Sequence, residues 1–161
     1  MRPKKLTLAA FGSFARRATV DFERFDDSSL LLIHGQTGGG KTTLLDGMCF
    51  ALYGETSGGA RTAREMRSHH AAESARTEVS FEFSVRGRDY LVKRSFRLVG
   101  PKATPKGQQE LLVRKPRPAG RDDDNDDDDD DGTFAAEYTT VATKVGDIDR
   151  HIHELLGLDA T

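Results

Sequence analysis

The sequence of 161 residues is long enough for one domain with a substantial core. Its formal net charge of −2 combines two opposite regions, because residues 122–131 include nine aspartates, and removing these nine negative charges from −2 leaves +7. A basic remainder permits a polyanionic partner. The single cysteine, Cys49, excludes an internal disulfide and favours a reducing compartment. Because no apolar run reaches the roughly 18 residues of a membrane span, we expect a cytoplasmic protein with no membrane contact.

Two short alternating segments open the chain. Apolar and more polar residues alternate over residues 6–9 and again over residues 19–22. This pattern predicts two half-buried strands, joined by a turn that contains residues 11–14.

A glycine-rich stretch follows at residues 34–43, which read His-Gly-Gln-Thr-Gly-Gly-Gly-Lys-Thr-Thr and match the phosphate-loop pattern G-x-x-x-x-G-K-[ST]. The apolar run at residues 30–33 predicts a buried parallel strand before it, and residues 44–53 predict a helix buried against a sheet after it. Backbone N–H groups of such a loop, together with the start of the helix, bind phosphate oxygens. We therefore predict an ATP site formed by Gly35, Gln36, Thr37, Gly38, Gly39, Gly40, Lys41, Thr42 and Thr43.

Two side chains of this loop have separate expected roles. Lys41 is expected to reach the β- and γ-phosphates, and the Thr42 hydroxyl is expected to coordinate the Mg²⁺ that accompanies the nucleotide. A residue of the turn at 11–14 either contacts the nucleotide base or belongs to a plain turn, and the sequence leaves both readings open.

The middle of the chain changes to a two-residue period. His69 and His70 precede it in a polar segment, where we favour solvent-exposed side chains over a metal site. Beyond them, alternation over residues 79–85 and 90–98 predicts two antiparallel strands with one wet face, and residues 111–113 predict a third.

The end of the chain adds one strand and one helix. The sequence predicts a strand around residues 138–141, and apolar residues at helical spacing predict a helix over residues 145–156. The glycine at position 157 is a natural helix stop.

A basic region lies on the predicted strands and their loops. Residues 86–121 contain eleven Lys and Arg against two acidic residues, which indicates a surface for the phosphate backbone of DNA; an ordinary solvated β face is the alternative. The DNA-contact candidates are Lys93, Arg94, Arg97, Lys102, Lys106, Arg114 and Lys115. Residues 116–132 read as an acidic, disordered insertion, because they have almost no apolar side chains with which to form a core.

Several segments together resemble the N-terminal half of the SbcC family of SMC-like ATPases. The likeness covers nearly the whole chain outside residues 116–132 and is carried by residues 11–14, 18–22, 32–46, 50–56 and 155–159. It implies an α/β fold of the P-loop NTPase type, in which residues 1–161 form the N-terminal lobe of an ABC-type head, with an antiparallel β subdomain beside a mixed sheet. Such heads bind ATP between two copies and couple its hydrolysis to DNA repair.

The resemblance also implies partners. These are the C-terminal lobe of the same ATPase, a second ATPase head, an SbcD-like nuclease subunit, and double-stranded DNA ends and hairpins near the nucleoid. Because we find no Walker B carboxylate, Q-loop or signature motif, we expect this chain alone to bind ATP without hydrolysing it. Two other classes stay open: another P-loop NTPase, such as an ABC transporter ATPase or a nucleotide kinase, and a non-catalytic module that binds nucleotide or DNA.

Overall fold

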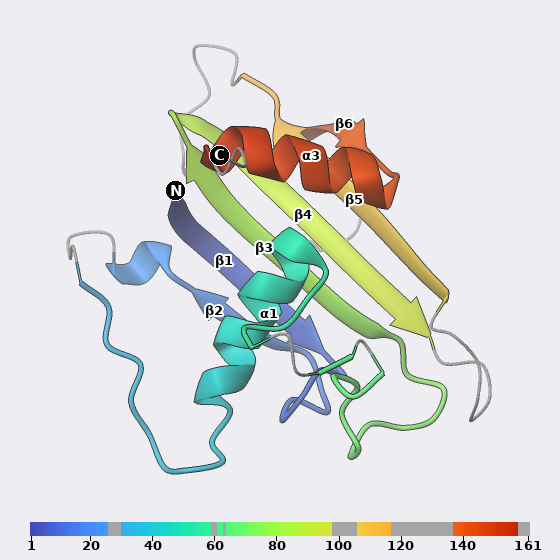
Figure 1. Cartoon of the computed structure of the whole chain (residues 1–161). Coiled ribbons are helices and arrows are strands. Elements are labelled where there is room, and N and C mark those ends of the chain that lie inside the picture. Colours follow the sequence, from blue (N-terminus) through green and yellow to red (C-terminus); the bar gives the residue numbers. More distant parts are fainter. Residues whose placement is uncertain (26–29, 59–60, 63, 98–105, 117–136, 158–161) are drawn as a thin grey trace.

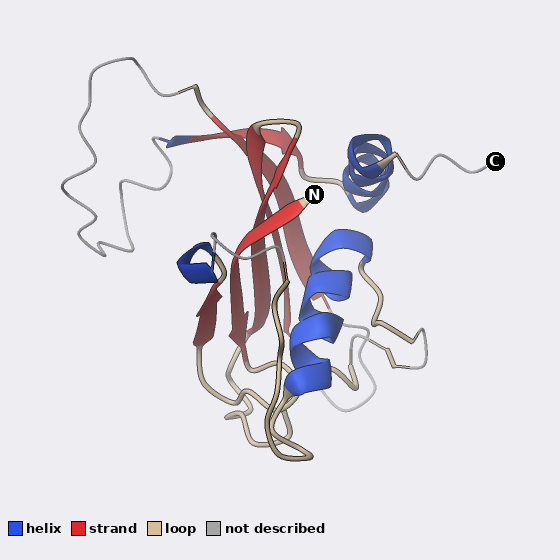
Figure 2. Ribbon diagram, turned by 90° about the vertical axis from the view of Figure 1, so that its left-hand side faces the viewer, coloured by secondary structure: helices blue, strands red, loops and turns tan. Residues whose placement is uncertain are grey.

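The computed structural model describes residues 1–25, 30–58, 61–62, 64–97, 106–116 and 137–157. Over these ranges, six strands form one antiparallel sheet in the order β2-β1-β3-β4-β5-β6, and helices α1 and α3 cover one of its faces (Figures 1 and 2). The strands are β1 (Arg2–Ala9), β2 (Ala18–Asp21), β3 (Thr77–Val85), β4 (Arg88–Arg97), β5 (Lys106–Arg114) and β6 (Tyr138–Ala142). The helices are the 3-10 turn η1 (Glu23–Phe25), α1 (Lys41–Tyr53) and α3 (Val145–Leu156). None of these helices is long and apolar enough to cross a membrane. Apart from its first residue, the predicted acidic insertion lies outside the described ranges.

The structure confirms the alternation that the sequence predicted for the strand at residues 79–85, because one face of this strand is covered and the other is open. Every second residue of β3, beginning at Thr77 and ending at Val85, is buried under the helices, and the residues between them are half-buried on the open face. Arg86 and Gly87 turn the chain into β4 with φ angles of 51° and 75°, the left-handed pair that a tight hairpin needs. The third strand is longer than its apolar residues predicted, because β5 pairs with β4 from Lys106 to Val113.

The helices dock through small and apolar residues. Gly47 lets α1 lie close to β1, since a Cβ at this position would be 2.6 Å from Leu8 Cδ2. The predicted helix over residues 145–156 is confirmed as α3, and its Ile148 and Ile152 are fully buried. Together these contacts build one core between the sheet and the two helices.

The expected parallel strand at residues 30–33 and the mixed sheet that would contain it are wrong for the described part of the chain. No strand forms there, and Leu30 and Leu32 are 84% and 78% exposed. The segment before α1 runs beside the sheet without joining it (Figure 1). A strand needs a neighbour to which its N–H and C=O groups can bond, and residues 30–33 pair with neither edge strand, β2 or β6.

Candidate functional site: the phosphate loop

The loop before α1 is curled by its glycines. Gly39 N donates to Gln36 O at 3.1 Å and closes a turn, while Gly38 and Gly40 adopt φ angles of 84° and 90° that side-chain-bearing residues rarely take. Gly40 is the N-cap of α1 and brings no side-chain hydrogen bond to the helix start. The first N–H groups of α1 have no partner within the helix, so they are available to an anion.

Lys41 is folded over this loop. Its Nζ donates to the carbonyl oxygens of Gly35 and Gln36, each at 2.8 Å. A Cβ built on Gly35 or Gly38 would have no atom within 4 Å, so the approach to the loop is open. The exposed Thr42 follows directly on the helix. The loop thus joins backbone donors, an ammonium group and a hydroxyl, the groups that suit a nucleotide phosphate chain and its Mg²⁺.

The turn at residues 11–14 lies against the beginning of α1. Phe11 and Phe14 exchange two backbone hydrogen bonds of 2.9 Å, and Ser13 Oγ is 3.3 Å from Thr43 Oγ1. The sequence predicted a turn here, and the fold brings it to the phosphate loop. Whether it contacts a nucleotide base stays a prediction.

Sequence reasoning gave no structural role to Asp46. Its carboxylate is buried on α1 and accepts hydrogen bonds from Ser57 N at 3.1 Å and Ser57 Oγ at 2.6 Å. Arg61 Nη1 lies 3.3 Å from the other carboxylate oxygen. Asp46 therefore ties the loop after α1 to the same helix that begins at the phosphate loop. A carboxylate within an otherwise apolar helix was the signal for this role.

Arg94 is not available to DNA, so its assignment as a DNA contact is wrong. Its side chain is buried, with Nε donating to Ala51 O at 2.7 Å and Nη2 donating to Leu52 O at 3.1 Å and to Asp149 Oδ1 at 2.8 Å. The guanidinium satisfies carbonyls in the last turn of α1 and pairs with α3. The alternation of apolar residues in the sequence could have predicted this burial, because Arg94 lies between Val92 and Phe96 on the covered face of β4.

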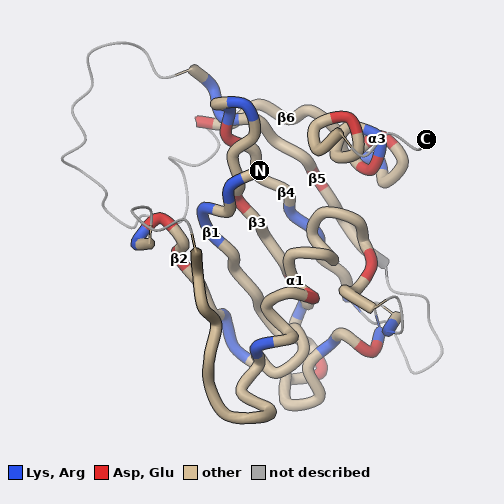
Figure 3. Tube along the Cα trace, turned by 60° about the vertical axis from the view of Figure 1, so that its left-hand side comes forward, with Lys and Arg blue, Asp and Glu red and all other residues tan. Residues whose placement is uncertain are grey.

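The other DNA-contact candidates are spread over two strands and their ends. Lys93 Nζ is 3.9 Å from Glu110 on the open face, and Arg97 is exposed at the end of β4. Arg114 pairs with Glu137 at 3.0 Å and Asp89 at 3.7 Å. Lys115 is exposed, Lys106 begins β5, and Lys102 lies outside the described residues. Lys and Arg are interspersed with Asp and Glu over the molecule (Figure 3).

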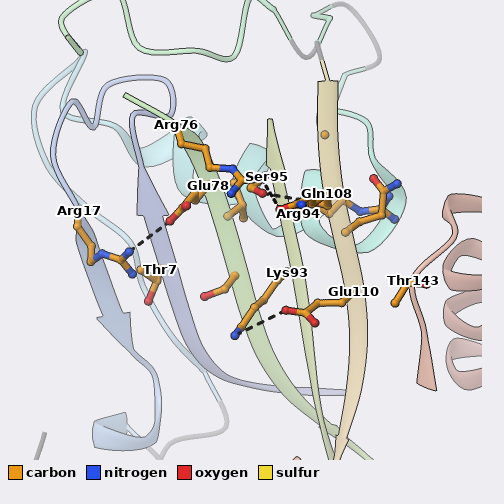
Figure 4. Close-up of a pocket in the computed structure, with 14 residues that line it drawn as sticks. Thr7, Arg17, Arg76, Glu78, Lys93, Arg94, Ser95, Gln108, Glu110 and Thr143 are labelled. Atoms are coloured by element: carbon orange, nitrogen blue, oxygen red, sulfur yellow. Dashed lines mark hydrogen bonds and ion pairs between the residues drawn. The ribbon is translucent and has the colours of Figure 1, made fainter. Parts of the chain in front are cut away.

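A groove of 720 Å³ lies on the open face of the sheet, away from α1 (Figure 4). Its lining combines arginines and a lysine with carboxylates and short hydroxyl side chains, and Arg17 pairs with Glu78 across it at 3.2 Å. Toward the other end of this face, burial raises the pKa of Glu82. The positive charge of the nearby Lys5 acts in the opposite direction and lowers this pKa. The groove is polar and carries both signs of charge.

The predicted exposure of two adjacent histidines can be compared with the structure. His69 and His70 are exposed, as expected, and within the described ranges no three His, Cys, Asp or Glu side chains are placed to hold a metal ion. Burial raises the pKa of Cys49, which favours its neutral thiol.

The curled loop, its lysine and the helix that follows have the pattern of a P-loop, the phosphate-binding element of nucleotide-binding domains. Residues 5–155 match the AAA domain family, and the chain belongs to this family. It is 38% identical over 159 residues, or 99% of its length, to the SbcC component of the nuclease SbcCD of Vibrio cholerae serotype O1. It is 42% and 40% identical over 94 residues, 58% of the chain, to the SbcC proteins of Staphylococcus saprophyticus and Staphylococcus haemolyticus.

These matches confirm the resemblance to SbcC. The chain spans 14% of the length of the Vibrio protein and 9% of the length of each staphylococcal protein, so it corresponds to a small part of each of these relatives.

Proposed function

We propose that this chain is the ATP-binding N-terminal lobe of an SbcC-like, ABC-type ATPase head that acts in DNA double-strand-break repair and recombination in the cytoplasm. The head would gate a partner nuclease at DNA ends and hairpins. The observation that carries the nucleotide role is the glycine-curled turn at the start of α1, with Lys41 Nζ 2.8 Å from two carbonyls of the same loop. The similarity to the SbcC component of the nuclease SbcCD supports the rest.

The bound nucleotide would be held mainly by its phosphates. Lys41 would exchange two neutral carbonyl acceptors, Gly35 O and Gln36 O, for phosphate oxygens, which are stronger acceptors for an ammonium group. The N–H groups at the start of α1 would donate to the same phosphates, and the Thr42 hydroxyl would hold Mg²⁺. Bound Mg-ATP supplies the phosphoryl group whose transfer to water would drive the head.

Titration with ATP, with and without Mg²⁺, tests this role. We expect Lys41→Ala to weaken binding by about a hundredfold, because it removes the one cation in the loop. Lys5→Ala is the matched control, since Lys5 is an exposed lysine on β1 far along the chain from the loop. Equal affinity of Lys41→Ala and wild type would refute the phosphate-loop assignment.

A complementary lobe is the proposed partner of residues 30–33. The 84% and 78% exposures of Leu30 and Leu32 are unusual for neighbouring large apolar residues and support the proposal that this run becomes a strand against that lobe. Mixing the chain with the C-terminal lobe of the ATPase should produce ATP hydrolysis and slow amide exchange at residues 30–33. Hydrolysis by this chain alone would contradict the half-enzyme proposal, and phosphate transfer to a small acceptor would favour a kinase.

DNA contact is proposed for the exposed basic residues of the sheet, with Arg94 excluded. Lys93, Arg97, Arg114 and Lys115 are the candidates whose described side chains are exposed or half-exposed. Charge reversal at Lys93 or Arg97 should weaken duplex binding equally for all sequences, and each lost phosphate contact should lower the slope of log affinity against log salt by about 1. A salt-independent affinity would refute the proposal.

A further inference from the structure

We propose that Ser13 and Phe14, in the turn between β1 and β2, are positioning residues of the phosphate loop that act on the binding of the phosphate chain and do not contact the base. This inference rests on the proposed nucleotide binding by the loop.

The phosphate loop meets the turn at residues 11–14 where it enters α1. Residues 34–39 are all exposed, whereas Gly40 and Thr43 are buried. The turn at residues 11–14 contacts both of these buried residues. The turn therefore supports the backbone at the point where the first N–H groups of α1 begin.

Residues 12, 13 and 14 of the turn each lie close to Gly40 or Thr43. Ser13 Oγ is 3.3 Å from Thr43 Oγ1. A Cβ on Gly40 would be 3.0 Å from Phe14 Cζ, so the aromatic ring packs directly on the Gly40 backbone. A Cβ on Gly12 would be 2.4 Å from Thr43 Cγ2. A side chain at Gly12 would clash with Thr43, and one at Gly40 would require the Phe14 ring to shift.

The turn is itself held firmly. Phe11 is fully buried and exchanges two backbone hydrogen bonds of 2.9 Å with Phe14, and Gly12 N donates to Met66 O at 2.7 Å. A rigid support of this kind reduces the conformational entropy that the loop loses when it binds a ligand. The smaller entropy loss increases the binding affinity.

The same contacts argue against a role for these side chains at the base. The Ser13 hydroxyl is next to Thr43, the Phe14 ring lies on Gly40, and Gly12 has no side chain. Each group that the turn presents is already engaged with the phosphate loop or the helix after it. A defect in the turn should therefore affect any ligand that carries the phosphate chain.

Binding of Mg-ATP and of inorganic tripolyphosphate with Mg²⁺ by the whole chain tests the proposal. We expect Ser13→Ala to weaken binding about threefold and Phe14→Ala about tenfold, by the same factor for both ligands. Thr19→Ala is the matched control, because it removes a hydroxyl pair of 3.2 Å with Thr7 in the same hairpin and should change neither affinity. Ser13→Thr should retain binding. If Phe14→Ala fails to fold, the exposed Ser13 supplies the test.

The outcomes separate this inference from the function on which it rests. Weaker binding of ATP with unchanged binding of tripolyphosphate would overturn it in favour of a base contact, and unchanged binding of both would overturn it altogether. A loss in Ser13→Ala that Thr19→Ala reproduces would also overturn it. If Lys41→Ala loses binding while the turn variants do not, the proposed function stands and only this inference fails.

Discussion

Arg94→Met is predicted to lower the free energy of unfolding more than the substitution of any exposed basic residue. The substitution keeps an unbranched apolar stem of similar length but removes the guanidinium that donates to Ala51 O, Leu52 O and Asp149 Oδ1. It would leave two carbonyls at the end of α1 without these donors and would remove the polar bridge from α1 through Arg94 of β4 to Asp149 of α3.

The size of the effect follows from burial. Each bond from the charged donor to a buried carbonyl contributes about 1.5–3 kcal/mol. The pair with Asp149 adds less, at most about 1 kcal/mol, because the side chain of Asp149 is 37% exposed and its charge is screened by water. We expect Arg94→Met to lower the free energy of unfolding by about 3–7 kcal/mol, a large part of the stability of a typical domain.

Urea unfolding followed by circular dichroism measures this loss, with Arg97→Met as the control. Arg97 lies on the same strand but is exposed, so its substitution should change the free energy of unfolding by less than about 0.5 kcal/mol. A loss below about 1 kcal/mol in Arg94→Met would refute the reasoning, since buried and paired charges cost more than that to remove.

Three further substitutions test other parts of the structure. Asp46→Asn weakens the anchor of Ser57, and we expect a loss of about 2 kcal/mol in urea unfolding together with faster proteolysis after α1; unchanged cleavage would contradict the anchor. Gly47→Ala should lower the free energy of unfolding by about 1 kcal/mol, and by less when Leu8 is also replaced by Val. A Gly47→Ala variant more stable than wild type would show that α1 and β1 are not in close contact at this position. Burial raises the pKa of Glu82 above its ordinary 4.5, so the folded state binds the proton more tightly than the unfolded state. The resulting contribution to stability is present below pH 4.5 and is lost as the pH rises through the pKa of the folded state. Glu82→Gln should therefore be more stable than wild type at neutral pH and no more stable at acidic pH, and a constant difference between the two would contradict burial as the cause.

The sequence by itself determined those features that depend only on neighbouring residues. The two-residue period of β3, the apolar stripe of α3 and the phosphate-loop pattern at residues 35–42 each express a local backbone geometry, so they could be read without knowledge of the partners. The matches to SbcC proteins agree with that reading.

Only the tertiary structure decided which segments find partners. Residues 30–33 have the composition of a buried strand, yet in the described ranges they lie outside the sheet, because pairing requires a neighbouring strand and composition cannot supply one. Arg94 was counted as surface charge although it shares the covered face of β4 with Val92, because a charge count records neither burial nor the carbonyls that make burial tolerable. The turn at residues 11–14 meets the phosphate loop for the same reason: antiparallel pairing of β1 with β2 and β3 determines where the turn lies relative to α1.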